Sequence, residues 1–289
     1  MRLFSTFLSG AVLIGVAIYL LSIAQPVRFE TSARGEANLA NGAYMMAAAG
    51  CASCHTQNQG NPNNLGGGVL ITSPFGAIVT PNISSNPKYG VGAWSDNDFL
   101  NAVKRGVSPT GDHYYPAFPY THYAGLTDRD VLDIKAYILS LPPSKSQPPD
   151  TNLPFPFNLR VGIGLWKHLN ALLLTPTHER HGGDRGRYLV EHAAHCGACH
   201  TPRNAALTLD QRRAFQGAIG FDGFAAPPLT PERLQAAGRD AFTNGVLAYG
   251  LRLDGAPLKA RTMVDVVDKT HQLTIEDRNA IYDYLISIE

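Results

Sequence analysis

Two copies of one short motif constrain this chain more than any other feature. The motif is CxxCH, and its six chemical residues are Cys51, Cys54, His55, Cys196, Cys199 and His200. This spacing is the attachment site of a c-type haem. The two thiols form thioethers to the porphyrin, and the histidine ligates the iron. The sequence therefore predicts two covalently bound haem c groups, with His55 and His200 as iron ligands.

Two other uses of paired cysteines compete with this interpretation. Two CxxC units could supply four ligands to zinc, and a single CxxC is also a dithiol redox motif. Zinc would require both motifs at one site, and dithiol chemistry does not require the following histidine. All four cysteines belong to the two motifs, and each pair carries the histidine. Covalent haem is therefore favoured, and no cysteine remains for a disulfide.

The N-terminus predicts export. Residues 8–24 form a nearly continuous apolar run, and no charged residue lies between Arg2 and Arg28. The run approaches the roughly 20 residues that span a bilayer and exceeds the about 7–15 of a signal-peptide core. We predict an N-terminal transmembrane helix within residues 1–30, with a cleaved signal as the alternative because residues 22–24 form an acceptable cleavage site. Either places the remaining chain outside the cytoplasm.

The chain repeats itself. Residues 126–138 align without a gap with residues 273–285, and the distance from motif histidine to capping threonine is 72 residues in one half and 74 in the other. This spacing indicates an internal duplication. We predict one domain over residues 31–144 and a second over 184–289. The net charge of +1 disfavours a nucleic-acid partner, which would need a basic surface.

Local signals place the main helices. We expect helices over residues 38–55, 95–106 and 127–141, with Ser95 and Thr127 as N-caps. Residues 74–89 are expected to be irregular. Between the domains, residues 145–183 are rich in proline at first and then carry an apolar helix at 161–174. We predict that this linker is a packed strap laid across both domains.

Several further motifs carry a family resemblance. They lie at residues 66–68 (GGG), 74–76 (PFG), 81–83 (PNI), 92–99 (GAWSDNDF) and 115–120 (YPAFPY), and in the second half at 187–190, 196–204 and 263–267. Over about residues 35–289 the chain resembles the cytochrome c subunits of membrane-bound bacterial dehydrogenases. Those subunits serve alcohol, gluconate, aldehyde and molybdenum-hydroxylase type enzymes.

The resemblance implies a mainly α fold of two tandem class I cytochrome c domains on the periplasmic side of the bacterial inner membrane. It also implies that electrons arrive from a periplasmic dehydrogenase and leave to a cytochrome, a quinone or a terminal oxidase of the respiratory chain. Two features depart from the family. Many of its members carry three haems, and Phe118 stands where the family's usual methionine would lie in the YPAFPY motif.

The sixth iron ligands are expected to differ between the haems. Met263 lies between the second motif and the last helix, where the family places its ligand, so we predict it for haem 2. Met45 and Met46 share a helix with the first motif and are poorly placed to reach the opposite haem face. For haem 1 we favour His122, with His113 or an open iron as alternatives.

The two expected sixth ligands predict a direction of electron flow. Methionine raises a haem potential relative to a harder ligand, so electrons would pass from haem 1 to haem 2. We expect an electron-transfer subunit with no catalytic residue of its own. The alternative is a dihaem peroxidase with an open haem 1, although residues 114–123 contain no Glu or Gln to assist it. His192 and His195, just before the second motif, are expected to be exposed or packed at its edge.

Overall fold

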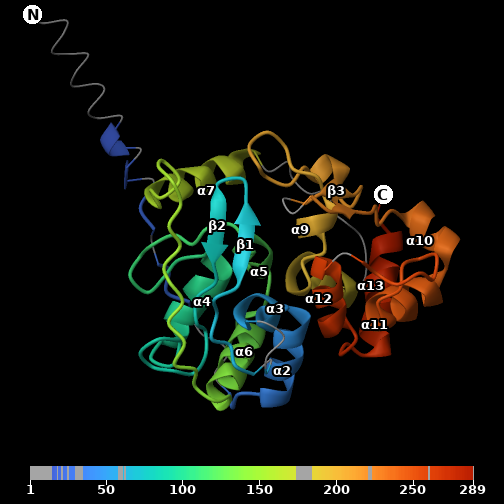
Figure 1. The fold of residues 1–289 in the computed structure, drawn as a ribbon, viewed down its shortest axis with the longest axis horizontal. Helices are drawn as coiled ribbons and strands as arrows, with labels where there is room; N and C mark the ends of the chain where they lie inside the picture. The colour runs from blue at the N-terminus through green and yellow to red at the C-terminus, as the bar shows by residue number, and fades with distance from the viewer. Residues whose placement is uncertain are drawn as a thin grey trace, which may run out of the picture.

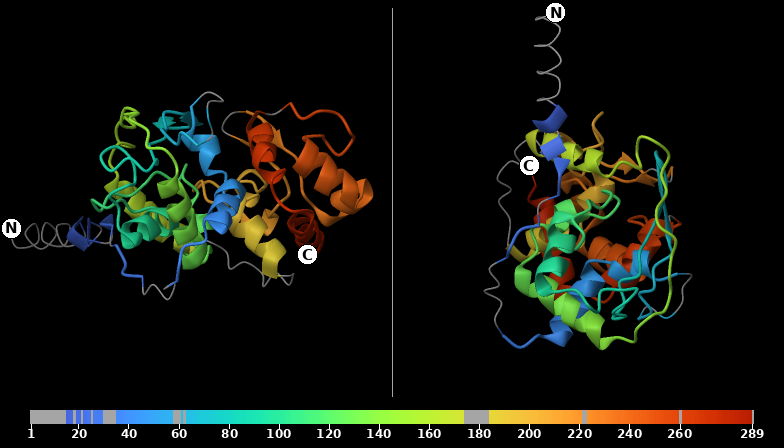
Figure 2. Two further views of the ribbon diagram at one scale, coloured as in Figure 1. Left: turned by 90° about the horizontal axis from the view of Figure 1, so that it is seen from below. Right: turned by 90° about the vertical axis from the view of Figure 1, so that its left-hand side faces the viewer.

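We describe the protein from a computed structural model (Figure 1). The described residues are 15–17, 19–20, 22–24, 26–29, 35–57, 61, 63–173, 184–220, 223–259 and 261–288. The structure is mostly helical, with two short antiparallel hairpins. A half built from the first part of the chain lies beside a half built from the last part (Figure 2).

The first half is a set of helices around one hairpin. Its elements are α2 (Leu39–Ala48), α3 (Cys51–His55), β1 (Leu70–Ser73), β2 (Gly76–Val79), α4 (Asp96–Arg105), α5 (Tyr120–Tyr123) and α6 (Asp128–Ser140). Capping fixes the helix starts as the sequence predicts. Ser95 Oγ accepts the Asp98 amide at 3.1 Å, and Thr127 Oγ1 accepts the Asp130 amide at 3.1 Å. Gly106, with φ of 58°, ends α4.

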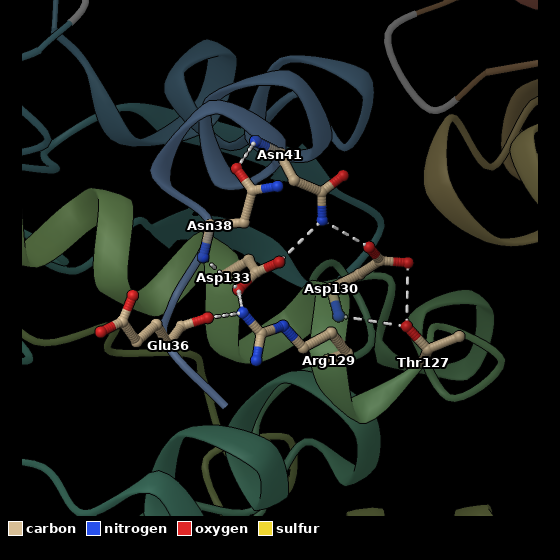
Figure 3. A network of polar contacts seen from close by, with 7 residues as sticks. All are labelled: Glu36, Asn38, Asn41, Thr127, Arg129, Asp130 and Asp133. Atoms are coloured by element: carbon tan, nitrogen blue, oxygen red, sulfur yellow. Dashed lines mark hydrogen bonds and ion pairs between the residues drawn. The ribbon is translucent and has the colours of Figure 1, made fainter. Parts of the chain in front are cut away.

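The closest packing in this half joins α2 to α6. A Cβ atom placed on Gly42 would lie 2.0 Å from the Asp133 carbonyl oxygen, so only glycine permits this approach. A network of polar contacts also joins α2 to α6 (Figure 3). Asp133 accepts bonds from the Asn38 amide at 3.0 Å and from Asn41 Nδ2 at 2.9 Å, and it pairs with Arg129 at 3.0 Å. The two helices are thereby held at one separation and one register.

The second half follows the same order. Its elements are α8 (Asp184–Arg187), η1 (Tyr188–Ala193), α9 (Gly197–His200), η2 (Gln211–Arg213), β3 (Ala218–Ile219), β4 (Ala225–Ala226), α10 (Pro231–Ala237), η3 (Ala241–Val246), α11 (Leu247–Tyr249), α12 (Arg261–Thr270) and α13 (Ile275–Ile286). Gly186 packs on α13 as Gly42 packs on α6, because its Cβ would lie 2.1 Å from the Ala280 carbonyl oxygen. Thr274 caps α13 through the Asp277 amide at 3.2 Å.

The segment between the halves packs against both of them. Asn82 Nδ2 donates to the Ser144 and Ser146 carbonyls at 3.1 and 2.9 Å. Helix α7 (Val161–Leu173) follows, and Lys167 Nζ donates to the Gly106 carbonyl at 3.0 Å. Trp166 Nε1 reaches the Ala206 carbonyl of the second half at 3.1 Å. The strap therefore contacts both halves, while its boundaries stay a prediction.

The structure corrects the local predictions at two places. Residues 74–89 are not wholly irregular, because β2 lies within them and pairs with β1 from Leu70↔Val79 to Ser73↔Gly76. The expected helix over 38–55 is broken at Gly50, whose φ of 67° is left-handed. Of the predicted apolar span, residues 8–14, 18 and 21 lie outside the described residues. In the part of the chain that the structure describes, no helix has both the length and the apolar character to cross a membrane.

Candidate haem-attachment sites

The first attachment site is a short helix set at an angle to the one before it. Gly50 ends the run of α2 in the left-handed region that glycine adopts freely. The turn sets Cys51, Cys54 and His55 on one helical segment, and both thiols are free. Burial raises the pKa of Cys51 to about 12, so the thiol is protonated at neutral pH. Both cysteines and the histidine of the motif therefore lie on the same short helical segment.

His55 is oriented by a hydrogen bond from its ring nitrogen Nδ1. Its Nδ1 lies 2.7 Å from the Pro81 carbonyl oxygen. A carbonyl only accepts, so Nδ1 carries the proton and Nε2 keeps its lone pair for a metal. Burial lowers the pKa of His55, with the Pro81 bond opposing the shift. Ligand histidines in metalloproteins usually donate their second nitrogen in this way.

The second attachment site has the same construction. His200 Nδ1 lies 2.7 Å from the Pro227 carbonyl oxygen, and burial lowers the pKa of this histidine too. The next backbone bond is also shared: the Gly67 amide donates to the His55 carbonyl, and the Gly217 amide donates to the His200 carbonyl, both at 2.8 Å. The donor sets of both motifs therefore fit covalent haem.

The two attachment sites lie near each other. Burial raises the pKa of Cys54, and the charges of Asp265 and Cys199, both in the second half, raise it further. Ser53 Oγ donates to the Asp265 carbonyl at 3.4 Å. Among the described residues, no group of three His, Cys, Asp or Glu side chains is arranged to hold a metal ion.

Phe118 and Met263 occupy corresponding places. Each lies 67 positions after the first cysteine of its motif. Phe118 packs against the ring of Tyr123 at a centroid distance of 5.6 Å, and Met263 is half-buried against the core on α12. The first half thus has an aromatic ring where the second half has a thioether. Met263 as an iron ligand stays a prediction.

The two histidines considered for haem 1 are held differently. His122 is bonded through Nδ1, 2.9 Å from the Glu191 carbonyl oxygen, and burial lowers its pKa. Its Nε2 therefore keeps the lone pair, as in His55. His113 instead places Nε2 3.1 Å from the Ser22 carbonyl oxygen. The nitrogen left with a lone pair is therefore Nε2 in His122 and Nδ1 in His113, where it is buried without a hydrogen-bond partner.

Reciprocal contacts join the halves. Helix α2 lies against α12, and α5 lies against η1. One tyrosine hydroxyl from each half binds a carboxylate and a backbone amide at the start of the other half's last helix. The bonds join Tyr44 to Asp277 and to the Thr274 amide (3.2 Å), and Tyr188 to Asp130 (2.5 Å) and to the Thr127 amide (3.1 Å). We call these two sets the crossed tyrosine contacts.

Sequence reasoning missed the residues of this interface. His195, expected at an edge, is half-buried with its ring against the first half. Its centroid lies 5.9 Å from His122 and 5.5 Å from Tyr123. Burial lowers the pKa of His195 to about 4, and His122 adds to the shift. The equivalent positions of Tyr44 and Tyr188 before the two motifs were the only signal in the sequence for such an interface.

Known proteins resemble this chain in sequence. Residues 39–142 match the cytochrome c family. The chain is 40% identical over 262 residues to a diheme cytochrome c-type protein of Cereibacter sphaeroides, covering 87% of this chain and 85% of that protein. It is 38% identical over 274 residues to the fructose dehydrogenase cytochrome subunit of Gluconobacter japonicus, covering 92% of this chain and 55% of that subunit.

A further relative is the gluconate 2-dehydrogenase cytochrome c subunit of Pantoea cypripedii, 32% identical over 270 residues, covering 88% of this chain and 60% of that subunit. The chain thus spans somewhat more than half the length of these two dehydrogenase subunits. The relative from Cereibacter sphaeroides matches nearly end to end. With a class I cytochrome c domain over residues 39–142 and this extent of identity, the chain belongs to the cytochrome c family that includes diheme cytochromes and cytochrome subunits of dehydrogenases.

Proposed function

We propose that this chain is a dihaem c-type cytochrome that carries electrons from a periplasmic dehydrogenase to the respiratory chain. The repeated attachment geometry supports it most. Both motif histidines bond a proline carbonyl through Nδ1 at 2.7 Å, and both leave Nε2 for iron. When bound, each haem supplies a one-electron iron couple. The dehydrogenase names of the relatives support the choice of donor.

The proposed ligand sets are His55 with His122 for haem 1, and His200 with Met263 for haem 2. The Nδ1 bond of His122 supports the first set, because it prepares the same tautomer as in His55. Met raises a haem potential relative to a nitrogen ligand, so electrons would enter at haem 1 and leave from haem 2. The acceptor would be a cytochrome, a quinone or a terminal oxidase.

We further propose that residues 8–24 remain attached as a membrane anchor, with the haem-bearing part on the periplasmic side of the inner membrane. The apolar run without charge between Arg2 and Arg28 supports this placement. N-terminal sequencing of protein purified from membranes should read from the start of the chain. A mature protein that begins near residue 25 would instead indicate a cleaved signal peptide.

The haem count and the electron donor test the function. Mass spectrometry of the full-length protein should give the polypeptide plus two haems that resist acid–acetone extraction. Mixing the oxidised protein with a membrane-bound dehydrogenase and its alcohol, gluconate or fructose substrate should reduce both haems. A single haem, or bound zinc, would overturn the proposal. Sustained peroxide turnover by a protein whose haem 1 is high spin would replace it with the peroxidase alternative.

Two substitutions test the ligand of haem 1. His122→Ala should convert haem 1 to high spin in the electron paramagnetic resonance spectrum, because no nitrogen would replace Nε2. His113→Ala is the matched control and should leave haem 1 low spin, since its Nε2 is engaged by Ser22. The reverse ranking would assign the ligand to His113.

A further inference from the structure

The duplication provides an internal control for His195. The residue just before the first motif is Gly50, and the residue just before the second is His195. Both are left-handed, with φ of 67° and 40°. Glycine adopts this region freely, whereas a residue with a Cβ does so at a cost. The fold itself does not need histidine here, because the first half makes the same turn with glycine.

The ring of His195 lies against helix α5 of the other half. Its nearest aromatic partners are His122 at 5.9 Å and Tyr123 at 5.5 Å between centroids. Tyr123 is itself fixed, because its hydroxyl donates to the Ala49 carbonyl at 2.7 Å. The side chain that replaces glycine therefore packs directly beside the histidine proposed to ligate haem 1.

The second half also departs from the repeat in the length of the segment before its motif. Eight positions separate Tyr188 from Cys196, against seven from Tyr44 to Cys51. The extra residue is absorbed by a π-helical turn in η1, where the Ala194 amide donates to the Leu189 carbonyl at 2.7 Å. Such turns often occur at functional positions.

This turn holds His122 on two sides. The Glu191 carbonyl accepts its Nδ1–H at 2.9 Å, and the His122 carbonyl accepts from His192 Nδ1 at 3.1 Å. The Glu191 side chain is fixed in turn by the Tyr284 hydroxyl at 2.5 Å. Every contact described for the His122 ring therefore comes from the second half.

We propose that the second half completes the haem 1 site, with the Glu191 carbonyl fixing the tautomer of His122 and His195 acting as a positioning residue for its ring. The proposal rests on the assignment of His122 under the proposed function. It implies that haem 1 depends on the interface between the halves, although its covalent attachment is entirely within the first. Loss of a group that orients a metal ligand typically lowers metal affinity or activity by about 10–100-fold.

The test is His195→Gly in the full-length protein with both haems attached. Gly50 makes the same turn in the first half, so haem content and thermal unfolding should be retained. The reduction equilibrium of haem 1 should shift by at least about tenfold, which is about 59 mV for a one-electron couple. Its low-spin resonance signal should also change or give way to high spin, and the spectrum of haem 2 should be unaltered.

Two more variants keep the result decisive. His195→Asn also tolerates the left-handed region but lacks the ring, so it should reproduce the effect on haem 1. His271→Gln is the matched control, because the exposed His271 ring contacts the Val267 carbonyl of α12 and its loss should leave the haem 1 signal unchanged. An unchanged haem 1 potential and signal in both His195 variants would overturn the positioning role.

The outcome for His122 separates this inference from the function itself. If His122→Ala alters haem 1 and His195→Gly does not, only the positioning role fails. If His122→Ala leaves haem 1 low spin, the ligand assignment and the positioning role both fail. Two covalent haems that a dehydrogenase still reduces would leave the electron-carrier function in place in either case.

Discussion

The two halves of this protein share a framework and differ in a few residues around it. Both orient the motif histidine by a bond to a proline carbonyl, both pack a glycine against the last helix, and both close a tight turn after a central helix. In that turn the Ser108 amide donates to the Asp112 carbonyl at 2.8 Å, and the Arg252 amide donates to the Ala256 carbonyl at 2.7 Å. Features fixed by close packing are therefore repeated.

The differences include two pairs of corresponding positions in the sequence. Phe118 corresponds to Met263, and Gly50 corresponds to His195. Gly50 and His195 share a left-handed backbone, whereas Phe118 lies in a turn before α5 and Met263 lies on α12. The comparison teaches that one helical framework accepts different residues around its two attachment motifs, and a π-helical turn before the second motif only.

The largest expected effect tests whether the two halves are packed alike. Gly42→Ala and Gly186→Ala should each lower the free energy of unfolding by about 3 kcal/mol, because each new Cβ would lie about 2 Å from a carbonyl oxygen of the facing helix. Guanidinium unfolding of the haem-loaded protein measures both. Gly162→Ala in α7 is the control, since nothing lies within 4 Å of its Cβ. Equal, small effects at all three glycines would refute the packing argument.

The next effect tests the difference between Phe118 and Met263. Met263→Ala should remove the red-end band of thioether-ligated iron and lower the haem 2 potential by more than about 0.1 V, a fraction of the roughly 0.8 V over which axial ligands act. Phe118→Met combined with His122→Ala is the converse variant and should add such a band from haem 1. Redox titration with visible spectroscopy reads out both. Survival of the band in Met263→Ala would show that another residue ligates haem 2.

A smaller effect tests the crossed tyrosine contacts. Tyr44→Phe and Tyr188→Phe should each cost about 1–2 kcal/mol of unfolding free energy, because each hydroxyl bonds a carboxylate and a backbone amide. Chemical denaturation of each variant measures the loss. Tyr137→Phe is the control, since its hydroxyl makes no hydrogen bond within the described ranges and should change stability by less than about 0.5 kcal/mol. A marked difference between the first two variants would break the symmetry of the interface.

The smallest expected effect is a change in how the stability of the protein depends on pH, and it involves Asp277. Burial raises the pKa of this carboxyl, but hydrogen bonds from Arg185 and Tyr44 outweigh it and hold the pKa below its ordinary 3.8. A lowered pKa contributes stability above the ordinary value, and this stability is lost as the pH falls through the folded pKa. Asp277→Asn should therefore flatten the loss of stability below about pH 4.

Asp283→Asn is the control for this pH profile. Asp283 lies on the same helix and pairs with Arg239 at 2.6 Å, but both side chains are about half exposed. Exposed pairs contribute little, so thermal unfolding of this variant between pH 2 and 7 should follow the unmodified protein. If the stability of Asp277→Asn varied with pH as that of the unmodified protein does, the buried carboxylate would not stabilise the interface.

The sequence predicted what depends on neighbouring residues. Capping by Ser95, Thr127 and Thr274 involves groups three positions apart, so local chemistry decides it. Helix α6 and the end of α4 at Gly106 follow from the same kind of signal. The two attachment motifs are equally local. Haem attachment could therefore be predicted from these motifs without knowledge of any tertiary contact.

What the sequence did not predict depends on distant contacts. Tyr44 and Asp277 are 233 positions apart, and no periodicity connects them. The role of His195 emerges only once the second half lies against His122. The hairpin of β1 and β2 was missed because each strand has four residues between prolines and glycines, too short for an alternating pattern to stand out.

The crossed tyrosine contacts also have a consequence for assembly. In a symmetric dimer, residue i of one subunit meets residue j of the other, and j meets i. Tyr44 and Tyr188 reproduce that isologous rule within a single polypeptide, as two copies of one ancestral subunit would after fusion of their genes. A surface that a lone half would use to pair with its copy is already covered internally. Any further subunit therefore has to bind through a different face of the molecule.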